Sequence, residues 1–123
     1  MMFRYIDTET FLKHLQMEGF HVRDVGLLDA ALNRPRASVF GEDAYPTLAM
    51  KAAAQTQSII KNHPMVDGNK RTSWFALNAL LALNFFVLEC SQDEAFEFLL
   101  GVATDKLNLD QVAEWIQLKA IEI

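Results

Sequence analysis

Apolar side chains recur along this chain with the spacing of amphipathic α-helices. Phe11, Leu12 and Leu15 fall on one helical face, and the pattern stops at Gly19, a residue type that often follows a helix. The same periodicity, together with capping residues, predicts six helices joined by short connections. Their expected ranges are Asp7–Glu18, Asp24–Asn33, Thr47–Asn62, Asn69–Asn84, Ser91–Ala103 and Asn108–Lys119.

The third and fourth predicted helices differ from the others in composition. Segment 47–62 is rich in alanine, whose small side chain lets helices pack closely. Segment 69–84 is apolar nearly all round after its first turn, as expected for a helix inside a domain. We therefore expect an all-α fold, a compact bundle of about six helices around the central apolar helix 69–84.

Two connections should not be α-helical. Residues 34–45 contain proline and glycine without a clear period, which indicates an exposed loop or a short hairpin in which Arg34 and Arg36 are solvated charges. Residues 85–89 are aromatic and branched enough for a short extended segment. Several large aromatic residues nearby are expected in the core rather than in a ligand site: Phe85, Phe86, Phe96, Phe98 and Trp115.

Length and composition exclude several classes of protein. The 123 residues suit one domain covering 1–123, and 51% hydrophobic and 22% charged residues are ordinary for a soluble globular chain. The net charge of −5 argues against direct DNA binding. The N-terminus has no secretory pattern, and the longest uncharged run, 72–88, contains polar residues and is short for a membrane span. A cytoplasmic location follows as the expectation.

The single cysteine, Cys90, offers neither a disulfide nor a zinc site and is expected to be buried.

The segment from His63 to Thr72, HPMVDGNKRT, carries the residues with the clearest chemistry. Pro64 disfavours helical dihedrals at His63, so the preceding helix should stop there and leave the imidazole at the entrance of a loop. Asp67 and Gly68 then precede the next helix, whose first free backbone N–H groups point toward the loop. A helix start of this kind binds anions without any special side chain.

Transfer of a phosphoryl or nucleotidyl group needs a base, a divalent cation and fixed donors, and this segment offers all three. His63 is the candidate base because an imidazole titrates near neutral pH. Asp67 is the candidate ligand for Mg²⁺, which commonly takes one carboxylate together with phosphate oxygens and water. The phosphates would be held by the rest of the segment, namely Gly68, Asn69, Lys70 and Arg71.

Each of these residues also has a simpler interpretation. A histidine before proline is often only a loop residue, Asp67 could be a helix cap, and Gly68 could simply make the turn. Lys70 and Arg71 could form a solvated helix face. The occurrence of all of them in one short ordered set, in front of an apolar helix, favours the functional interpretation.

The segment resembles the signature of the Fic/Doc (Fido) superfamily, which reads His, x, Phe, x, Asp or Glu, Gly, Asn, Gly or Lys, Arg. Lys70, followed by Arg71 and Thr72, resembles the death-on-curing (Doc) toxin branch. The AMP-transferring Fic branch has glycine at this position and a second arginine where this chain has Trp74. Met65 replaces the usual phenylalanine and can fill the same apolar space. Other Doc-like stretches extend the resemblance over most of 20–84: 26–36 (GLLDAALNRPR), 40–48 and 61–62.

The resemblance implies a toxin of a type II toxin–antitoxin pair. It would act as a protein kinase that moves the γ-phosphate of ATP to a hydroxyl of a translation factor, elongation factor Tu in the family, and so halts translation. By motif position, His63 would be the base, Asp67 the Mg²⁺ ligand, and the four residues after Asp67 the phosphate site. Two alternatives stay open: AMP transfer to a hydroxyl, and a non-catalytic module that binds nucleotide or antitoxin.

Three further features bear on these alternatives. A long cation at Lys70 fills space where the Fic branch seats phosphates, so ATP is hypothesised to bind reversed and present its γ-phosphate. Many Fic proteins contain an inhibitory helix with Ser or Thr, three residues, Glu, then Gly or Asn; here only Glu18 is followed by such a residue, and His14 precedes it by four. A separate, Phd-like antitoxin is therefore implied. The loop 35–45 stands where the family has a flap that pairs with the target protein.

Overall fold

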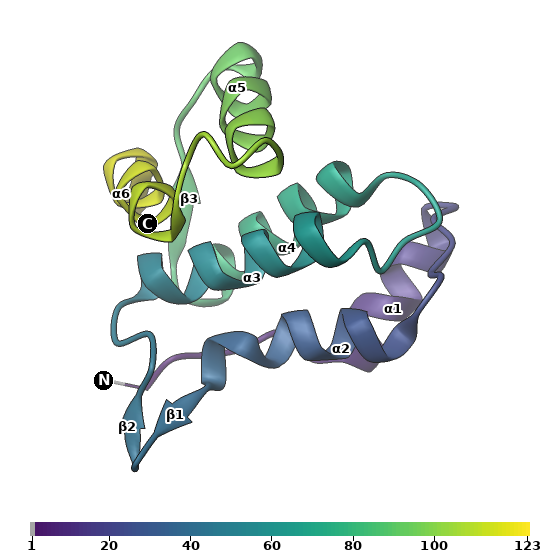
Figure 1. Cartoon of the computed structure of the whole chain (residues 1–123), viewed down its shortest axis with the longest axis horizontal. Coiled ribbons are helices and arrows are strands. Elements are labelled where there is room, and N and C mark those ends of the chain that lie inside the picture. The colour runs from purple at the N-terminus through teal and green to yellow at the C-terminus, as the bar shows by residue number, and fades with distance from the viewer. Residues whose placement is uncertain (1) are drawn as a thin grey trace.

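The computed structural model describes residues 2–123, which form six α-helices, one 3₁₀ turn and two short two-stranded antiparallel sheets (Figure 1). The all-α expectation is confirmed. In chain order the elements are α1 (Thr8–Met17), α2 (Val25–Asn33), η1 (Arg34–Arg36), β1 (Ser38–Val39), β2 (Glu42–Asp43), α3 (Leu48–Asn62), α4 (Asn69–Leu83), β3 (Phe86–Leu88), α5 (Gln92–Ala103), α6 (Leu109–Lys119) and β4 (Ala120–Glu122).

The helix starts follow from local side-chain chemistry. At five of the six, the side chain before the first helical residue accepts a hydrogen bond from a backbone N–H of the first turn, as a capping residue does: Asp7, Asp24, Thr47, Ser91 and Asn108. The last two complete the predicted capping boxes. The remaining helix, α4, begins at the predicted phosphate site, and within residues 2–123 it has no such side-chain cap.

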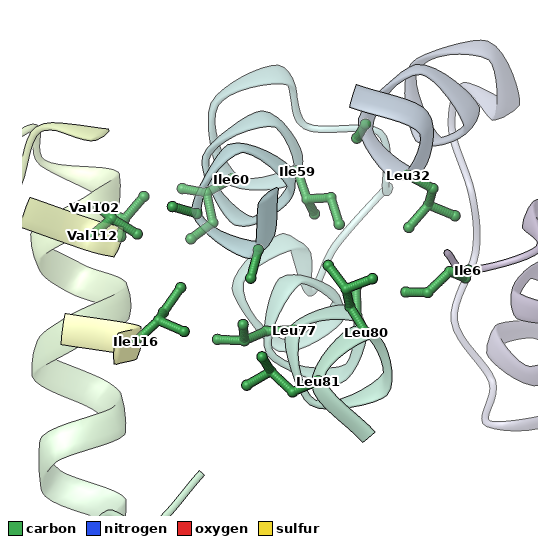
Figure 2. Packing of buried hydrophobic residues seen from close by; sticks show 14 of the residues in the cluster. Ile6, Leu32, Ile59, Ile60, Leu77, Leu80, Leu81, Val102, Val112 and Ile116 are labelled. Carbon is green, nitrogen blue, oxygen red and sulfur yellow. The ribbon is translucent and has the colours of Figure 1, made fainter. Parts of the chain in front are cut away.

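Helices α3 and α4 lie side by side in the middle of the molecule, between α1 and α2 on one side and α5 and α6 on the other (Figure 1). Apolar side chains fill both sides of this pair, with Leu80 near Leu32 and Ile6, and Leu77 near Ile116 (Figure 2). The most deeply buried helix is α3, because its run of three alanines is fully covered. From the sequence, we expected residues 69–84, which form α4, to be the central helix by themselves. In the structure α3 shares the central position, and α4 leaves Phe75 39% exposed.

The segment before α3 forms a short hairpin, the second of the two alternatives that the sequence left open. Strands β1 and β2 pair through Ser38 with Asp43 and Val39 with Glu42. The expectation that both nearby arginines are solvated is wrong for Arg34, which is half-buried. Its guanidinium donates hydrogen bonds to four groups that hold the segment against α3: the Tyr45 hydroxyl (2.9 Å), the Ala54 carbonyl (3.1 Å), Gln57 Oε1 (3.1 Å) and Ser58 Oγ (2.8 Å).

The C-terminal part corrects two smaller expectations. The predicted extended segment is β3, which pairs with β4. Phe85 and Phe96 are 58% and 63% exposed, so they lie outside the core, whereas Phe98 is buried and stacks on Trp115 with 3.9 Å between ring centroids. Cys90 is half-buried rather than buried. Within residues 2–123, the helices are too short or too polar to cross a membrane.

Candidate phosphate-binding site

The loop between α3 and α4 carries the predicted site and begins at His63. This residue caps α3 in the left-handed conformation, with φ 52° and ψ 60°, so the helix ends where Pro64 predicts. The side chain of His63 is exposed, whereas Pro64 and Met65 are buried. The loop is therefore anchored in the core just after the candidate base.

A second segment, 21–24, runs along this loop and pairs with it. Val22 forms an isolated antiparallel bridge with Met65. The surrounding backbone bonds run from Arg23 N to Pro64 O (2.8 Å), from Asp24 N to Pro64 O (3.0 Å) and from Val66 N to His21 O (2.9 Å). Asp24 also caps α2, so the start of α2 and the loop of the site are joined at one residue.

The side chain of Asn69 stabilises the loop from its other end. Its Oδ1 accepts a hydrogen bond from Met65 N at 2.9 Å, and its Nδ2 lies 3.3 Å from Met65 O. Met65 is 1% exposed, in agreement with the packing role expected for it. Because the amide of Asn69 is engaged with the loop, the part of Asn69 that faces an anion at the helix start is its backbone N–H.

Gly68 begins α4 with φ 76° and ψ 31°, a conformation that favours glycine. Among residues 2–123, the first turn of α4 is without a side-chain cap, so its N–H groups stay available to a bound anion. A Cβ at Gly68 would lie 2.9 Å from Cε1 of Phe20. Glycine is thus favoured at this position for two reasons: the backbone is left-handed, and the Phe20 ring leaves too little space for a Cβ.

A cleft of about 640 Å³ opens at the start of α4. It brings together four of the predicted residues, Asp67, Gly68, Lys70 and Arg71, but its lining in the described chain does not include His63 or Asn69. Trp74 of α4, where the AMP-transferring pattern has arginine, lines the cleft as well. The cleft also contains residues that the sequence did not single out for this site, contributed by the end of α1 with the turn after it and by α5: Glu18, Phe20, His21, Ala95 and Leu99. Nothing in the local sequence relates these groups, because they meet only through packing.

The cleft contains two cations at the start of α4, Lys70 and Arg71, and two carboxylates, Asp67 before that helix and Glu18 at the end of α1. Lys70 and Arg71 are exposed, and the Arg71 guanidinium carbon lies 6.0 Å from the ring centroid of Phe20. Asp67 is also exposed. The described part of the chain contains no cluster of three or more metal-ligating side chains. The carboxylate of Asp67 is a hard oxygen donor of the kind that Mg²⁺ takes together with phosphate oxygens and water.

A family model described as "Fic/DOC family" matches residues 2–81, which is more than half of the chain. The chain belongs to the Fic/Doc family. The Fic/Doc match covers the elements from α1 to α3, the loop between α3 and α4, and α4 except for its last two residues. Toxin Doc of Mycolicibacterium smegmatis (strain ATCC 700084 / mc(2)155) is 50% identical over 94 residues, 75% of this chain and 72% of that protein. Fic/Doc membership supports a transferase type of enzyme in general.

Proposed function

We propose that this Fic/Doc protein is the toxin of a toxin–antitoxin pair and a protein kinase. It would transfer the γ-phosphate of ATP to a hydroxyl of a translation factor, elongation factor Tu by family resemblance, in the cytoplasm. The observation that carries the proposal is the cleft in which Asp67, Lys70 and Arg71 surround the uncapped start of α4. The similarity to a Doc toxin supports the biological role.

The proposed reaction is a direct phosphoryl transfer. The substrate hydroxyl oxygen forms a bond to the γ-phosphorus, and the bond from that phosphorus to the bridging oxygen of ADP breaks. His63 accepts the hydroxyl proton, and ADP leaves with the electron pair of the broken bond as negative charge on its terminal phosphate. Lys70, Arg71 and the N–H groups of the first turn of α4 hold the phosphate oxygens and stabilise the charge that develops on them.

Asp67 is the residue that would hold Mg²⁺ together with oxygens of the nucleotide. When bound, the ion neutralises phosphate charge. His63 is exposed and lies outside the lining of the cleft, so in this proposal the substrate hydroxyl would approach the terminal phosphate from the loop that carries His63.

The distribution of polarity in the cleft supports the γ-phosphate as the transferred group. Lys70 and Trp74 are one helical turn apart on the same face of α4, and Trp74 shares the cleft with Ala95 and Leu99 of α5. An aromatic and aliphatic surface suits a nucleobase better than a phosphate. With the nucleobase of ATP at this apolar end of the cleft, the terminal phosphate would lie near Gly68. AMP transfer is the alternative, and it would require phosphates to occupy the apolar end.

The proposal includes two protein partners. A separate, Phd-like antitoxin would neutralise the toxin. The target protein would pair with the β1–β2 hairpin, whose strands are exposed and whose tip carries the fully exposed Phe40. An extended peptide added to such an edge gains backbone hydrogen bonds.

The test uses purified elongation factor Tu and ATP labelled at either the α or the γ phosphate. We expect γ label on the protein substrate, and none with His63→Ala, whose fold should be intact because the side chain is exposed. Asp67→Asn should weaken Mg²⁺-dependent nucleotide binding in titration calorimetry. Incorporation of α label would identify AMP transfer, and the absence of both labels on a panel of translation factors would support the non-catalytic module. Growth arrest that persists with His63→Ala would contradict the mechanism.

A further inference from the structure

Arg23 contacts the backbone of the loop that carries His63, although the two residues are 40 positions apart. Its guanidinium donates hydrogen bonds to the His63 carbonyl from Nε at 3.1 Å and from Nη2 at 2.5 Å, and Nη2 lies 3.3 Å from the Asn62 carbonyl. The backbone N–H groups of Arg23 and Asp24 take the Pro64 carbonyl at 2.8 and 3.0 Å. Three consecutive carbonyl groups, 62–64, therefore accept hydrogen bonds from one pair of residues.

The backbone of His63 needs such support. With φ 52°, it lies in the left-handed region, which a residue with a Cβ rarely adopts and which persists only where the surrounding structure imposes it. The carbonyl groups at the end of α3 also lack partners within the helix, and a cation beside them is favourable. The Arg23 guanidinium supplies both the donors and the charge.

We propose that Arg23 is the positioning residue of His63. By holding the His63 and Asn62 carbonyls together, it fixes the backbone from which the imidazole projects, and hence the direction in which the base meets the substrate hydroxyl. The inference rests on the proposed role of His63 as the base. A displacement of about 1 Å at a reacting group can cost roughly 100-fold in rate, so a backbone device of this kind has a measurable kinetic consequence.

The chemistry of the guanidinium separates this role from a general effect of charge. Nε and Nη2 both point to the His63 carbonyl, and only a planar fork presents two such donors together. A lysine at 23 would keep the charge near the end of α3 but offers a single ammonium. Arg23→Lys should therefore retain most of the stability and lose most of the positioning.

The experiment compares Arg23→Ala and Arg23→Lys with a matched control, Arg4→Ala, in the γ-phosphate transfer assay. Arg4 is also exposed, but its guanidinium lies over Phe85, away from the cleft. We expect kcat to fall about 10- to 100-fold for both Arg23 variants, with an unchanged KM for ATP, and to be unaffected in Arg4→Ala. Added guanidinium ion should restore part of the kcat of Arg23→Ala and none of that of His63→Ala.

Two results would overturn the inference. One is wild-type kcat in Arg23→Ala. The other is a loss of kcat that follows the loss of melting temperature across the variants and is not restored by guanidinium, because that indicates a helix cap and nothing more. Failure of the proposed function itself is distinguishable, since the wild-type protein then transfers no label. In that case, NMR tests the positioning directly: the backbone coupling constant and Cα shift of His63 should leave their left-handed values in Arg23→Ala, and unchanged values would refute the role.

Discussion

The ring of Phe20 lies directly beside the Cα of Gly68, where a Cβ would come within 2.9 Å of Phe20 Cε1. The same ring makes an edge contact with Phe75, with 6.1 Å between centroids, and lies under the Arg71 guanidinium. Phe20 thus joins the turn after α1 to the first two turns of α4. The start of α4, where we propose that phosphate binds, thus packs against an aromatic residue that precedes it by more than forty positions.

This contact predicts the effect of adding a single methyl group. Gly68→Ala should be destabilised by about 2–3 kcal/mol, because the residue meets both a left-handed backbone and the Phe20 ring. Gly41 is the matched control: its φ is 80° and a Cβ there has open space, so Gly41→Ala should lose only about 1 kcal/mol. Urea unfolding of both variants measures the difference. Equal losses would show that the ring moves aside at little cost.

The hairpin depends on a buried cation. Lys51 is fully buried on α3, and its Nζ lies 3.1 Å from the Pro35 carbonyl and 3.3 Å from Asp43 Oδ2. Asp43→Ala removes the carboxylate and should cost about 1–3 kcal/mol, because the buried ammonium keeps fewer partners. The neighbouring change Glu42→Ala, at an exposed position, should cost much less. Thermal unfolding and amide exchange over 38–43 measure both effects, and identical behaviour of the two variants would exclude this role of Lys51.

Lys70 and Trp74 should together determine which phosphate is transferred. The double variant Lys70→Gly/Trp74→Arg restores the two residues of the AMP-transferring pattern, opening space at the helix start and placing a cation at the apolar end of the cleft. We expect γ labelling of the protein substrate to fall and α labelling to rise relative to the wild type. Each single variant should lose γ labelling without gaining α labelling. A double variant that still transfers only γ label would place the choice elsewhere in the site.

The ion pair between α5 and α6 predicts a dependence of stability on pH. A hydrogen bond from Lys119, with a smaller contribution from Ser91 N–H, lowers the pKa of Glu94 to about 2. Because the folded pKa is depressed, the stabilisation is complete above the unfolded value of 4.5 and is lost as the pH falls through about 2. Glu94→Gln keeps the capping box but not the charge. Its melting temperature should lie below that of the wild type at pH 6, and the gap should close toward pH 2. Glu97→Gln serves as the exposed control, and a gap that is independent of pH would disprove the linkage.

The features that were correctly predicted from the sequence depend on contacts between close neighbours. Capping side chains reach backbone groups only three positions away, so Ser91 and Asn108 could be assigned to helix starts without any knowledge of the fold. The signature segment is equally local, because Pro64 ends α3 and Gly68 begins α4 within one loop. Family membership followed from the order of residues in that loop.

The remaining features were beyond prediction because they depend on packing between distant segments. Arg34 was expected in solvent and instead bonds groups up to 24 positions away, and Lys51 is buried because the hairpin folds over α3. Likewise, Phe20 closes against Gly68 and Arg23 reaches His63 only once the turn after α1 lies along the loop. Periodicity and caps report the interactions within a helix, and so the sequence defined the helices and the chemistry of the site. The shape of the cleft and the support of the loop that carries His63 came from side chains that share no local pattern and meet only after the helices have packed.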